Sequence, residues 1–421
     1  MPDSDLRNVA PRAIAVSKVL EDVMKNDRGK LLTGLISRLG RFKTAEDALQ
    51  EALISALGHW GRAGIPAAPH SWLMKAAYNK GIDRVRKNAR EIRKVSEYGD
   101  LQPAWASFDY PEELPDERLR LIFTCCHPEL EEKTRVALTL RTVCGLTTRE
   151  IAEVFLDTEA AMGQRISRAK KIIKAKNLGF SVPGPELWQE RLSAVLSSIF
   201  LVFTTGYVKD DCQERLLCAE ALFLARLINQ LRPNEPEIEG LLALMMLTEA
   251  RRAARVDHDG RTIPLEAQNR QLWDSALLAE AEQILAVAVA RRQPGAFQIK
   301  AAIADCHMMA PVPDWQQMCM LYRALWQFEP TSVVALNWSV VVAEMGFVEL
   351  ALEEINALED QLNDFQPWHA ARASIFEKLQ RTDDAPAAYE IAIAKADHAG
   401  NREFLKLSLL NERMDIVHEI G

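Results

Sequence analysis

The stretch that decides the fold is LTTREIAEVFLDTEAAMGQRISRAKKIIKAK, residues 146–176. It predicts a short helix, a tight turn at residues 156–158 and a longer helix, because Thr147 and Glu150 have the spacing of a capping box. In the longer helix, apolar residues recur at steps of four, three and four and leave a basic face outside. The residues expected inside are Met162, Ile166, Ala169 and Ile173, and those expected outside are Gln164, Arg165, Arg168 and Lys171. This pattern is typical of a helix-turn-helix that enters the major groove of DNA, although helix pairs of this size also serve as simple packing units.

Charge is unevenly distributed, and the basic part of the chain is the part that contains this helix pair. The 421 residues have a formal net charge of −8, but residues 1–180 hold 30 Lys and Arg against 24 Asp and Glu. Residues 181–421 hold 21 against 35. Basic residues concentrate in two segments, residues 75–94 and 165–176. Two such segments indicate two contacts with nucleic acid, against the alternative of two solvated helix faces.

Composition excludes several classes of protein. With 48% apolar and 26% charged residues, the chain is neither mainly disordered nor collagen-like. The longest uninterrupted apolar runs, among them residues 241–247, are far shorter than the roughly 20 residues that cross a bilayer. The acidic start lacks the pattern of a signal peptide, and the seven scattered cysteines indicate reduced thiols. We therefore expect a cytoplasmic protein without a membrane span.

Nearly every periodic stretch has helical spacing, so the predicted fold class is all-α. Residues 96–115 contain three prolines, one glycine and no apolar stripe, which indicates an extended linker. A second break falls at residues 179–185. We therefore expect two small helical domains, residues 8–95 and 116–178, followed by a helical extension, residues 186–421.

The first domain contains a predicted amphipathic helix over residues 44–60. Thr44 and Asp47 have the spacing of a capping box, and apolar residues at helical spacing form a buried stripe. The outer face is expected to carry Glu46, Asp47, Gln50 and Glu51. An acidic face beside a basic segment suggests a basic protein partner, although a merely solvated face explains the pattern as well.

The next helix of this domain is predicted for residues 71–94. Its candidate nucleic-acid contacts combine an aromatic ring, an amide and charged groups: Trp72, Lys75, Asn79, Asp83, Arg84, Arg86 and Lys87. Single-stranded nucleic acid needs a surface on which bases stack, groups that read base edges, and cations for the phosphates. The alternative for Trp72 is a place in the core.

Catalytic motifs are missing from the sequence. It contains no glycine-rich phosphate loop, no His-Glu-x-x-His and no nucleophile elbow. Cys125-Cys126-His127 suggests metal ligands, but no second ligand pair follows at zinc-finger spacing, and Pro128 indicates an apolar helix end instead. Residues 257–260 fit a polar turn. We therefore expect no enzyme activity, no metal and no cofactor.

The extension is acidic and helical. Helices are predicted for residues 187–203, 212–230, 237–255, 269–291 and 296–309. From about residue 312, similar segments recur at intervals close to the 34 residues of a tetratricopeptide repeat. Such repeats form a concave surface that binds protein segments, while a plain helical bundle is the alternative.

Taken in order, these segments resemble an extracytoplasmic-function sigma factor of the sigma-70 class, in the subgroup whose long C-terminal extension ends in tetratricopeptide-like repeats. The resemblance covers nearly the whole chain. The motifs that carry it are AEDALQEA (45–52), WLM (72–74), DRVR (83–86), LIFTCCHP (121–128), LTTREIA (146–152) and RISRAK (165–170). Each motif is weak alone, and their order makes the match specific.

The resemblance implies a role in transcription initiation, in which the polymerase does the chemistry. It implies that Asp47, Gln50 and Glu51 bind the clamp helices of the β′ subunit of core RNA polymerase. The helix that starts near Trp72 would capture the melted non-template strand of the promoter −10 element. The loop at residues 65–70 would hold a flipped base.

The resemblance also assigns roles to the later segments. The helix-turn-helix would read the −35 element as duplex DNA, and the β flap of polymerase is a second expected contact. The implied −35 residues are Thr148, Gln164, Arg165, Arg168 and Lys171. The extension would regulate activity in cis, with a protein ligand of its repeats as a further partner. Its implied regulatory residues are Arg270, Trp273 and Asp274.

Two segments depart from the family pattern. Recognition helices of the family often begin with Thr-Val-Lys, where this chain has Ala161-Met162-Gly163, so one basic contact is missing. The extension often has an acidic-Gln-acidic-Arg run before Leu-Trp-Asp, and here Ala267 and Asn269 replace both acidic residues.

Two other functions remain open from the sequence. A DNA-binding activator with a repeat-type sensor domain would bind duplex operator by itself, and a repeat scaffold would not bind DNA. The acidic helix at residues 44–60 favours the sigma factor, because an activator has no need of it. A scaffold leaves both basic segments unexplained.

Overall fold

The computed structural model describes residues 6–39, 42–93, 115–155, 157–176, 178, 180–207, 212–258, 261–308, 313–396 and 399–420. Regular structure in these ranges is helical, and the only extended pairing within them is an isolated β-bridge between Val256 and Thr262. The all-α fold class is confirmed. The predicted linker lies outside the described residues except at Pro115. The chain divides into two compact units, Met1–Leu231 and Arg232–Gly421.

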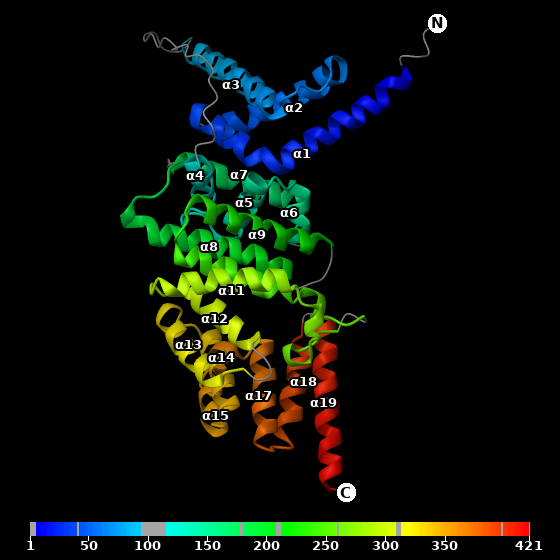
Figure 1. The fold of residues 1–421 in the computed structure, drawn as a ribbon, viewed down its shortest axis with the longest axis vertical. Helices are drawn as coiled ribbons and strands as arrows, with labels where there is room; N and C mark the ends of the chain where they lie inside the picture. Colours follow the sequence, from blue (N-terminus) through cyan, green and yellow to red (C-terminus); the bar gives the residue numbers. More distant parts are fainter. Residues whose placement is uncertain are drawn as a thin grey trace. The chain divides into compact units, whose positions relative to one another are not determined.

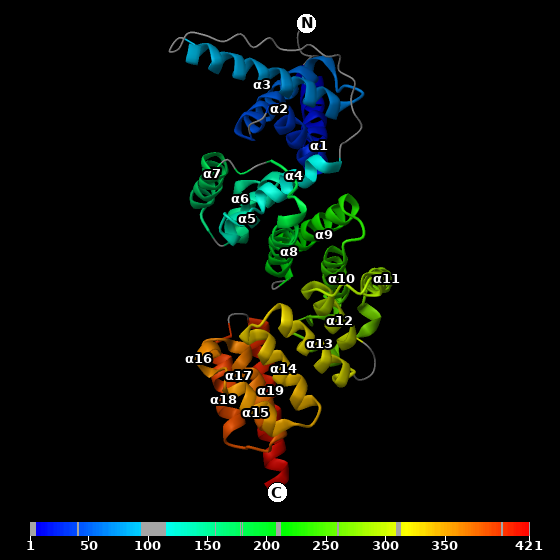
Figure 2. The ribbon, with the colours of Figure 1, turned by 90° about the vertical axis from the view of Figure 1, so that its left-hand side faces the viewer.

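The first unit begins with three helices that pack on one another (Figures 1 and 2): α1 (Leu6–Leu39), α2 (Phe42–Ala63) and α3 (Pro69–Arg93). These helices contribute several fully buried leucines to the core: Leu32, Leu35, Leu49 and Leu73. Helices α1 and α3 approach closely at Gly81, where a Cβ atom would lie 2.4 Å from Cδ1 of Leu39. The predicted cap at Thr44 is wrong, because α2 begins two residues earlier and Thr44 lies inside its first turn.

The second set of helices contains the expected helix-turn-helix. Its elements are α4 (Pro115–Cys125), α5 (Glu132–Thr139), the π-helical turn η1 (Leu140–Cys144), α6 (Thr148–Val154) and α7 (Glu159–Ala175). The predicted capping box is confirmed at α6: the backbone N–H of Glu150 donates to Oγ1 of Thr147 (3.1 Å), and the N–H of Thr147 donates to the Glu150 carboxylate (2.6 Å). The predicted inner side chains Met162, Ile166 and Ala169 are buried, while Ile173 is half-buried.

Helices α8 (Pro185–Tyr207) and α9 (Cys212–Leu231) belong to the same compact unit (Figure 2). They pack against α4, α5 and α6. Nη2 of Arg191 donates to the carbonyl oxygen of Phe123 (2.8 Å), and the Phe123 ring packs against Trp188 with 5.3 Å between centroids. The first two helices of the extension therefore complete the hydrophobic core around the helix-turn-helix.

The second unit is a succession of helices in which α11 and α12 pack against a nearly fully buried α10. From α13 onward, each long helix packs against the next, and α17, α18 and α19 lie side by side (Figure 1). The elements are α10 (Pro236–Ala250), η2 (Arg252–Ala254), η3 (Leu265–Ala267), η4 (Arg270–Leu272), α11 (Ser275–Ala290), α12 (Ala296–Met308), α13 (Trp315–Phe328), α14 (Ser332–Glu344), α15 (Val348–Asn356), α16 (Glu359–Leu362), α17 (Gln366–Lys378), α18 (Asp384–Ala394) and α19 (Ala399–Ile420). The assignment of the last helices to tetratricopeptide-like repeats stays a prediction.

Two helices of the extension are shorter than the sequence predicts. The helix expected over residues 237–255 ends at Ala250 and is followed by a separate 3-10 turn. The helix expected over residues 269–291 begins only at Ser275, because the side chain of Asp274 caps it and the preceding residues form another 3-10 turn. None of the described helices is long and apolar enough to cross a membrane.

Candidate nucleic-acid interface

The predicted acidic face of α2 lies at the surface of the first unit and contacts α3. Asp47 and Glu51 are one helical turn apart, and both pair with Arg84 of α3. Nη1 of Arg84 lies 2.8 Å from Oδ2 of Asp47 and 3.5 Å from Oε1 of Glu51. Gln50 is exposed between them. The fold therefore brings together side chains that the sequence assigned to two different partners.

Glu46 on the same helix is 8% exposed, so its predicted place on the outer face is wrong. Its carboxylate accepts a hydrogen bond from Nζ of Lys170 on α7 and lies 3.6 Å from Nη2 of Arg28 on α1. Burial, together with the nearby charge of Arg141, lowers the pKa of Arg28 to about 10, and Glu46 opposes this shift. The periodicity of α2 could not reveal this burial, because the residue that covers Glu46 lies 124 positions further along the chain.

Trp72 lies between aromatic rings of α2. Its ring stacks on His59 with 5.6 Å between centroids and meets Trp60 edge-on at 5.4 Å. Trp60 is buried, whereas Trp72 is half-buried. The ring is thus fixed by packing and is still partly exposed at the surface.

The other predicted contacts on α3 follow Trp72 along the helix. Lys75, Asn79 and Asp83 are exposed and are spaced by four residues, so they lie along one side of α3. Arg86 and Lys87 also belong to α3, but their side chains lie outside the described residues. The described part of α3 therefore presents a cation, an amide and a carboxylate that follow the half-buried Trp72 along one side of the helix.

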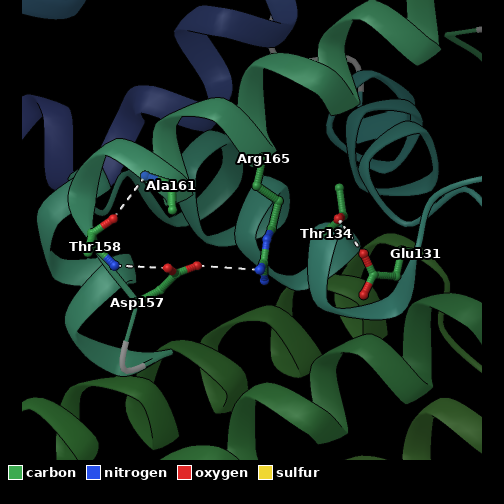
Figure 3. A network of polar contacts seen from close by, with 6 residues as sticks. All are labelled: Glu131, Thr134, Asp157, Thr158, Ala161 and Arg165. Atoms are coloured by element: carbon green, nitrogen blue, oxygen red, sulfur yellow. Dashed lines mark hydrogen bonds and ion pairs between the residues drawn. The ribbon is translucent and has the colours of Figure 1, made fainter.

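The turn ahead of α7 is held by a short polar network (Figure 3). Oγ1 of Thr158 accepts from the N–H of Ala161 (3.2 Å) and caps the helix. Oδ1 of Asp157 accepts from the N–H of Thr158 (2.9 Å), and its Oδ2 lies 3.3 Å from Nη2 of Arg165. Arg165 is therefore drawn back toward the turn and is half-buried.

The remaining predicted contacts of α7 face solvent. Gln164, Arg168 and Lys171 are exposed. Thr148 is half-buried at the start of α6. Its Cγ2 lies 3.8 Å from the position that a Cβ atom would occupy at Gly163. An amide and two cations are thus available to a duplex, while Lys170 and Arg165 bind acidic side chains of the chain itself.

Arg270, Trp273 and Asp274 hold the loop between α10 and α11. Nη1 of Arg270 donates to the carbonyl oxygen of Met308 (2.8 Å), and its guanidinium lies 4.9 Å from the centre of the Trp273 ring. Asp274 caps α11, and its own N–H donates to the carbonyl oxygen of Ala250 (2.9 Å). These side chains connect the ends of α10, α11 and α12, which the sequence pattern did not indicate.

Metal-binding groups are not assembled in the described ranges, where no cluster of three or more His, Cys, Asp or Glu side chains could hold an ion. Cys125 and Cys126 are buried at the end of α4, as predicted for structural cysteines, and burial raises the pKa of both thiols. In the predicted polar turn at residues 257–260, residues 259 and 260 lie outside the described residues, and Oδ1 of Asp257 accepts from the N–H of Arg261 (2.9 Å).

Three families match successive parts of the chain. Sigma-70 region 2 matches residues 27–91, which hold the C-terminal part of α1, all of α2 and most of α3. Sigma-70 region 4 matches residues 120–173, which include α6 and most of α7. A family of unknown function, DUF6596, matches residues 191–289, from α8 to α11. Regions 2 and 4 in this order define a sigma factor of the sigma-70 type, a class that binds core RNA polymerase and promoter DNA.

Two relatives are similar to this chain. An uncharacterized protein of Rhizobium meliloti is 37% identical over 393 residues, which cover 91% of this chain and 93% of that protein. The ECF RNA polymerase sigma-E factor of Haemophilus influenzae is 27% identical over 153 residues, which cover 34% of this chain and 80% of that protein. No solved structure matches the chain. The chain belongs to the family of the Rhizobium protein and is built as a sigma-70-type, ECF-like sigma factor with a helical extension.

Proposed function

We propose that this sigma factor binds the β′ clamp helices of core RNA polymerase through Asp47, Gln50 and Glu51 of α2 and directs the enzyme to specific promoters. The observation that carries the proposal is a partly exposed acidic face on α2 beside the cationic helix α3, both within region 2. An acidic helix face attracts a basic protein surface and repels DNA, so α2 is suited to the polymerase and α3 to the nucleic acid.

The melted non-template strand of the −10 element is the proposed ligand of α3. The half-buried ring of Trp72 is the proposed stacking surface, Asn79 can bond to a base edge, and Lys75 can bind a phosphate. The neighbouring cations Arg84, Arg86 and Lys87 complete the proposed phosphate contacts on this helix.

The duplex −35 element is the proposed ligand of α7. Gln164 and Arg168 are long, exposed side chains whose amide and guanidinium groups suit base edges in the major groove, and Lys171 suits a phosphate. Thr148 and Arg165 flank these groups. Region 4 would also contact the β flap, as a second point of attachment to the polymerase.

The extension is proposed to regulate this activity in cis. Its first helices, α8 and α9, pack on the region 4 core through the contact of Arg191 with Phe123. The DUF6596 match starts at Arg191 and continues into the second unit, so one family segment runs from region 4 to the loop held by Arg270, Trp273 and Asp274. A protein ligand bound by the last helices would act through this segment.

Run-off transcription with bacterial core polymerase and a promoter library tests the proposal. We expect promoter-specific transcripts only when the full chain is added. A variant with Asp47→Lys and Glu51→Lys should lose at least tenfold in transcript yield, because like charges now meet at the polymerase. The matched control reverses two exposed carboxylates of the second unit, Glu359→Lys and Asp360→Lys. Transcripts that survive the α2 reversal unchanged would contradict the proposed docking.

Regulation in cis is tested by truncation. A chain that ends after Leu231 removes the second unit and keeps α8 and α9 on region 4. A cut after residue 180 would instead expose the core around Phe123. A change of more than threefold in transcript yield, in either direction, supports regulation by the second unit. Equal yields from the full and shortened chains would contradict it.

A further inference from the structure

Arg84 on α3 contacts carboxylates whose proposed partner differs from its own. Arg84 is assigned to DNA, whereas Asp47 and Glu51 are assigned to polymerase, so the inference rests on the proposed function. In the structure these three side chains bind one another, at 2.8 Å and 3.5 Å from Nη1 of Arg84. We call this ion cluster the Arg84 clasp. While the clasp is closed, the cation is neutralised and the carboxylates are occupied.

The exposure of the clasp makes it exchangeable. The side chain of Arg84 is 41% exposed, and those of Asp47 and Glu51 are 30% and 45% exposed. Ion pairs at this exposure contribute little, because water competes for both charges. Two carboxylates against one guanidinium also leave one negative charge in excess. A cationic protein surface is therefore still attracted to α2 and can take the carboxylates from Arg84.

We propose that Arg84 is a coupling residue. In the free protein Asp47 and Glu51 hold it, and polymerase docking on these carboxylates releases its guanidinium toward the nucleic acid. Docking then raises the affinity of α3 for a single strand. By thermodynamic linkage, a bound strand raises the affinity for polymerase by the same factor.

The first test measures how the Arg84 clasp affects binding of single-stranded DNA in the absence of polymerase. The full chain is titrated with a fluorescent 20-nucleotide oligo(dT), and the dissociation constant is measured by anisotropy at several salt concentrations. Asp47→Asn should bind roughly two- to fivefold more tightly, the range that an exposed ion pair allows. Its dependence on salt should steepen by about 0.7 in the logarithmic plot, as expected for one more phosphate contact to a single strand.

The controls separate release of Arg84 from a change in net charge. Asp22→Asn neutralises an exposed carboxylate of α1 and should leave the affinity nearly unchanged. Asp47→Asn in an Arg84→Ala background should gain nothing over Arg84→Ala alone. The proposal that the clasp restrains Arg84 is refuted if Asp47→Asn fails to tighten DNA binding, or if it tightens DNA binding equally in both backgrounds.

The second test measures the coupling between polymerase binding and DNA binding. The affinity of the full chain for core polymerase is measured with and without saturating oligo(dT). We expect the oligonucleotide to tighten polymerase binding two- to fivefold for the unaltered chain and not at all for Arg84→Ala. Equal behaviour of the two chains overturns the coupling. A chain that does not bind polymerase at all would refute the proposed function and its coupling, while the first test would still decide on the clasp.

Discussion

Helix α2 carries two ion clusters that differ chiefly in their access to water. In the first, Glu46 contacts Arg28 and Lys170, with side chains 11%, 7% and 22% exposed. In the second, the Arg84 clasp, every side chain is at least 30% exposed. Glu46 and Asp47 are adjacent in the sequence, and each carboxylate meets an arginine of a neighbouring helix. Carboxylate–arginine ion pairs therefore occur in two environments on one helix, one buried and one partly exposed.

The difference separates a structural contact from an exchangeable one. A charge left without a partner inside the protein pays the cost of desolvation, so the partners of Glu46 stay in place. A charge released at the surface is solvated at once, so the partners of Asp47 can change. The Glu46 cluster joins α1 and α2 of region 2 to α7 of region 4, whereas the Arg84 clasp lies wholly within region 2.

The largest expected effect comes from Glu46→Ala. It leaves the buried guanidinium of Arg28 without its acidic partner, and breaking a buried pair in this way typically costs about 3–5 kcal/mol. The free energy of unfolding in urea, followed by tryptophan fluorescence, should fall by this amount. A fall of less than about 1 kcal/mol would place Glu46 in the same class as the clasp.

A triple variant controls for the change in packing. Replacing the cluster with apolar side chains of similar length, Arg28→Met, Glu46→Leu and Lys170→Met, removes the charges together. Buried ion clusters replaced in this way often keep their stability. The triple variant should therefore be more stable than Glu46→Ala, and equal stability would show that lost packing, not an unpaired charge, dominates the single change.

Lys170→Met is expected to have an intermediate effect. It removes one charge-assisted hydrogen bond to Glu46 while Arg28 remains, so we expect a loss of about 1.5 kcal/mol. Lys171→Met is the matched control, because Lys171 is the next residue on α7 and is exposed. Hydrogen–deuterium exchange of the α7 backbone should speed up in the first variant alone. Equal exchange in both would mean that Lys170 does not hold α7.

Local features of this fold were predictable because their causes are local. The capping box of Thr147 and Glu150 and the buried stripe of Met162 and Ile166 depend on spacing within a few residues, and the structure confirms both. At Thr44 the same spacing misled, because a helix that begins two residues earlier leaves no donor for its side chain to cap. Capping-box spacing therefore indicates that a helix is present more reliably than it indicates the residue at which the helix begins.

Long-range pairings could not be predicted from one sequence. Helical periodicity places Glu46 beside Asp47 on the outer face of α2, and nothing in that pattern says that Lys170 covers one of them. In the same way, the contact of Arg270 with the end of α12 joins residues that lie 38 positions apart in the sequence. The candidate site was therefore predictable as a set of residues, while the ion pairs that join its members were not.

Arg84→Ala is expected to change stability by less than about 1 kcal/mol, although its guanidinium contacts two carboxylates. The reason is that both carboxylates regain water when the cation is removed. The measurement is the same urea titration as for Glu46→Ala, so the two values can be compared directly. A loss as large as that of Glu46→Ala would mean that the clasp is structural, and it would remove the basis for exchange with polymerase.

The smallest expected effect, that of salt, tests the cause of the difference between the clusters. Raising NaCl from 0.1 M to 1 M shortens the screening length from about 10 Å to about 3 Å. The coupling energy of Asp47 and Arg84, obtained from Asp47→Asn, Arg84→Ala and the double variant, should then fall from below about 1 kcal/mol toward zero. The coupling energy of Glu46 and Lys170 should keep most of its value, because their side chains are largely shielded from the ions. Equal losses in the two cycles would show that burial does not distinguish the clusters, and that the exchange proposed for Arg84 should apply to Lys170 as well.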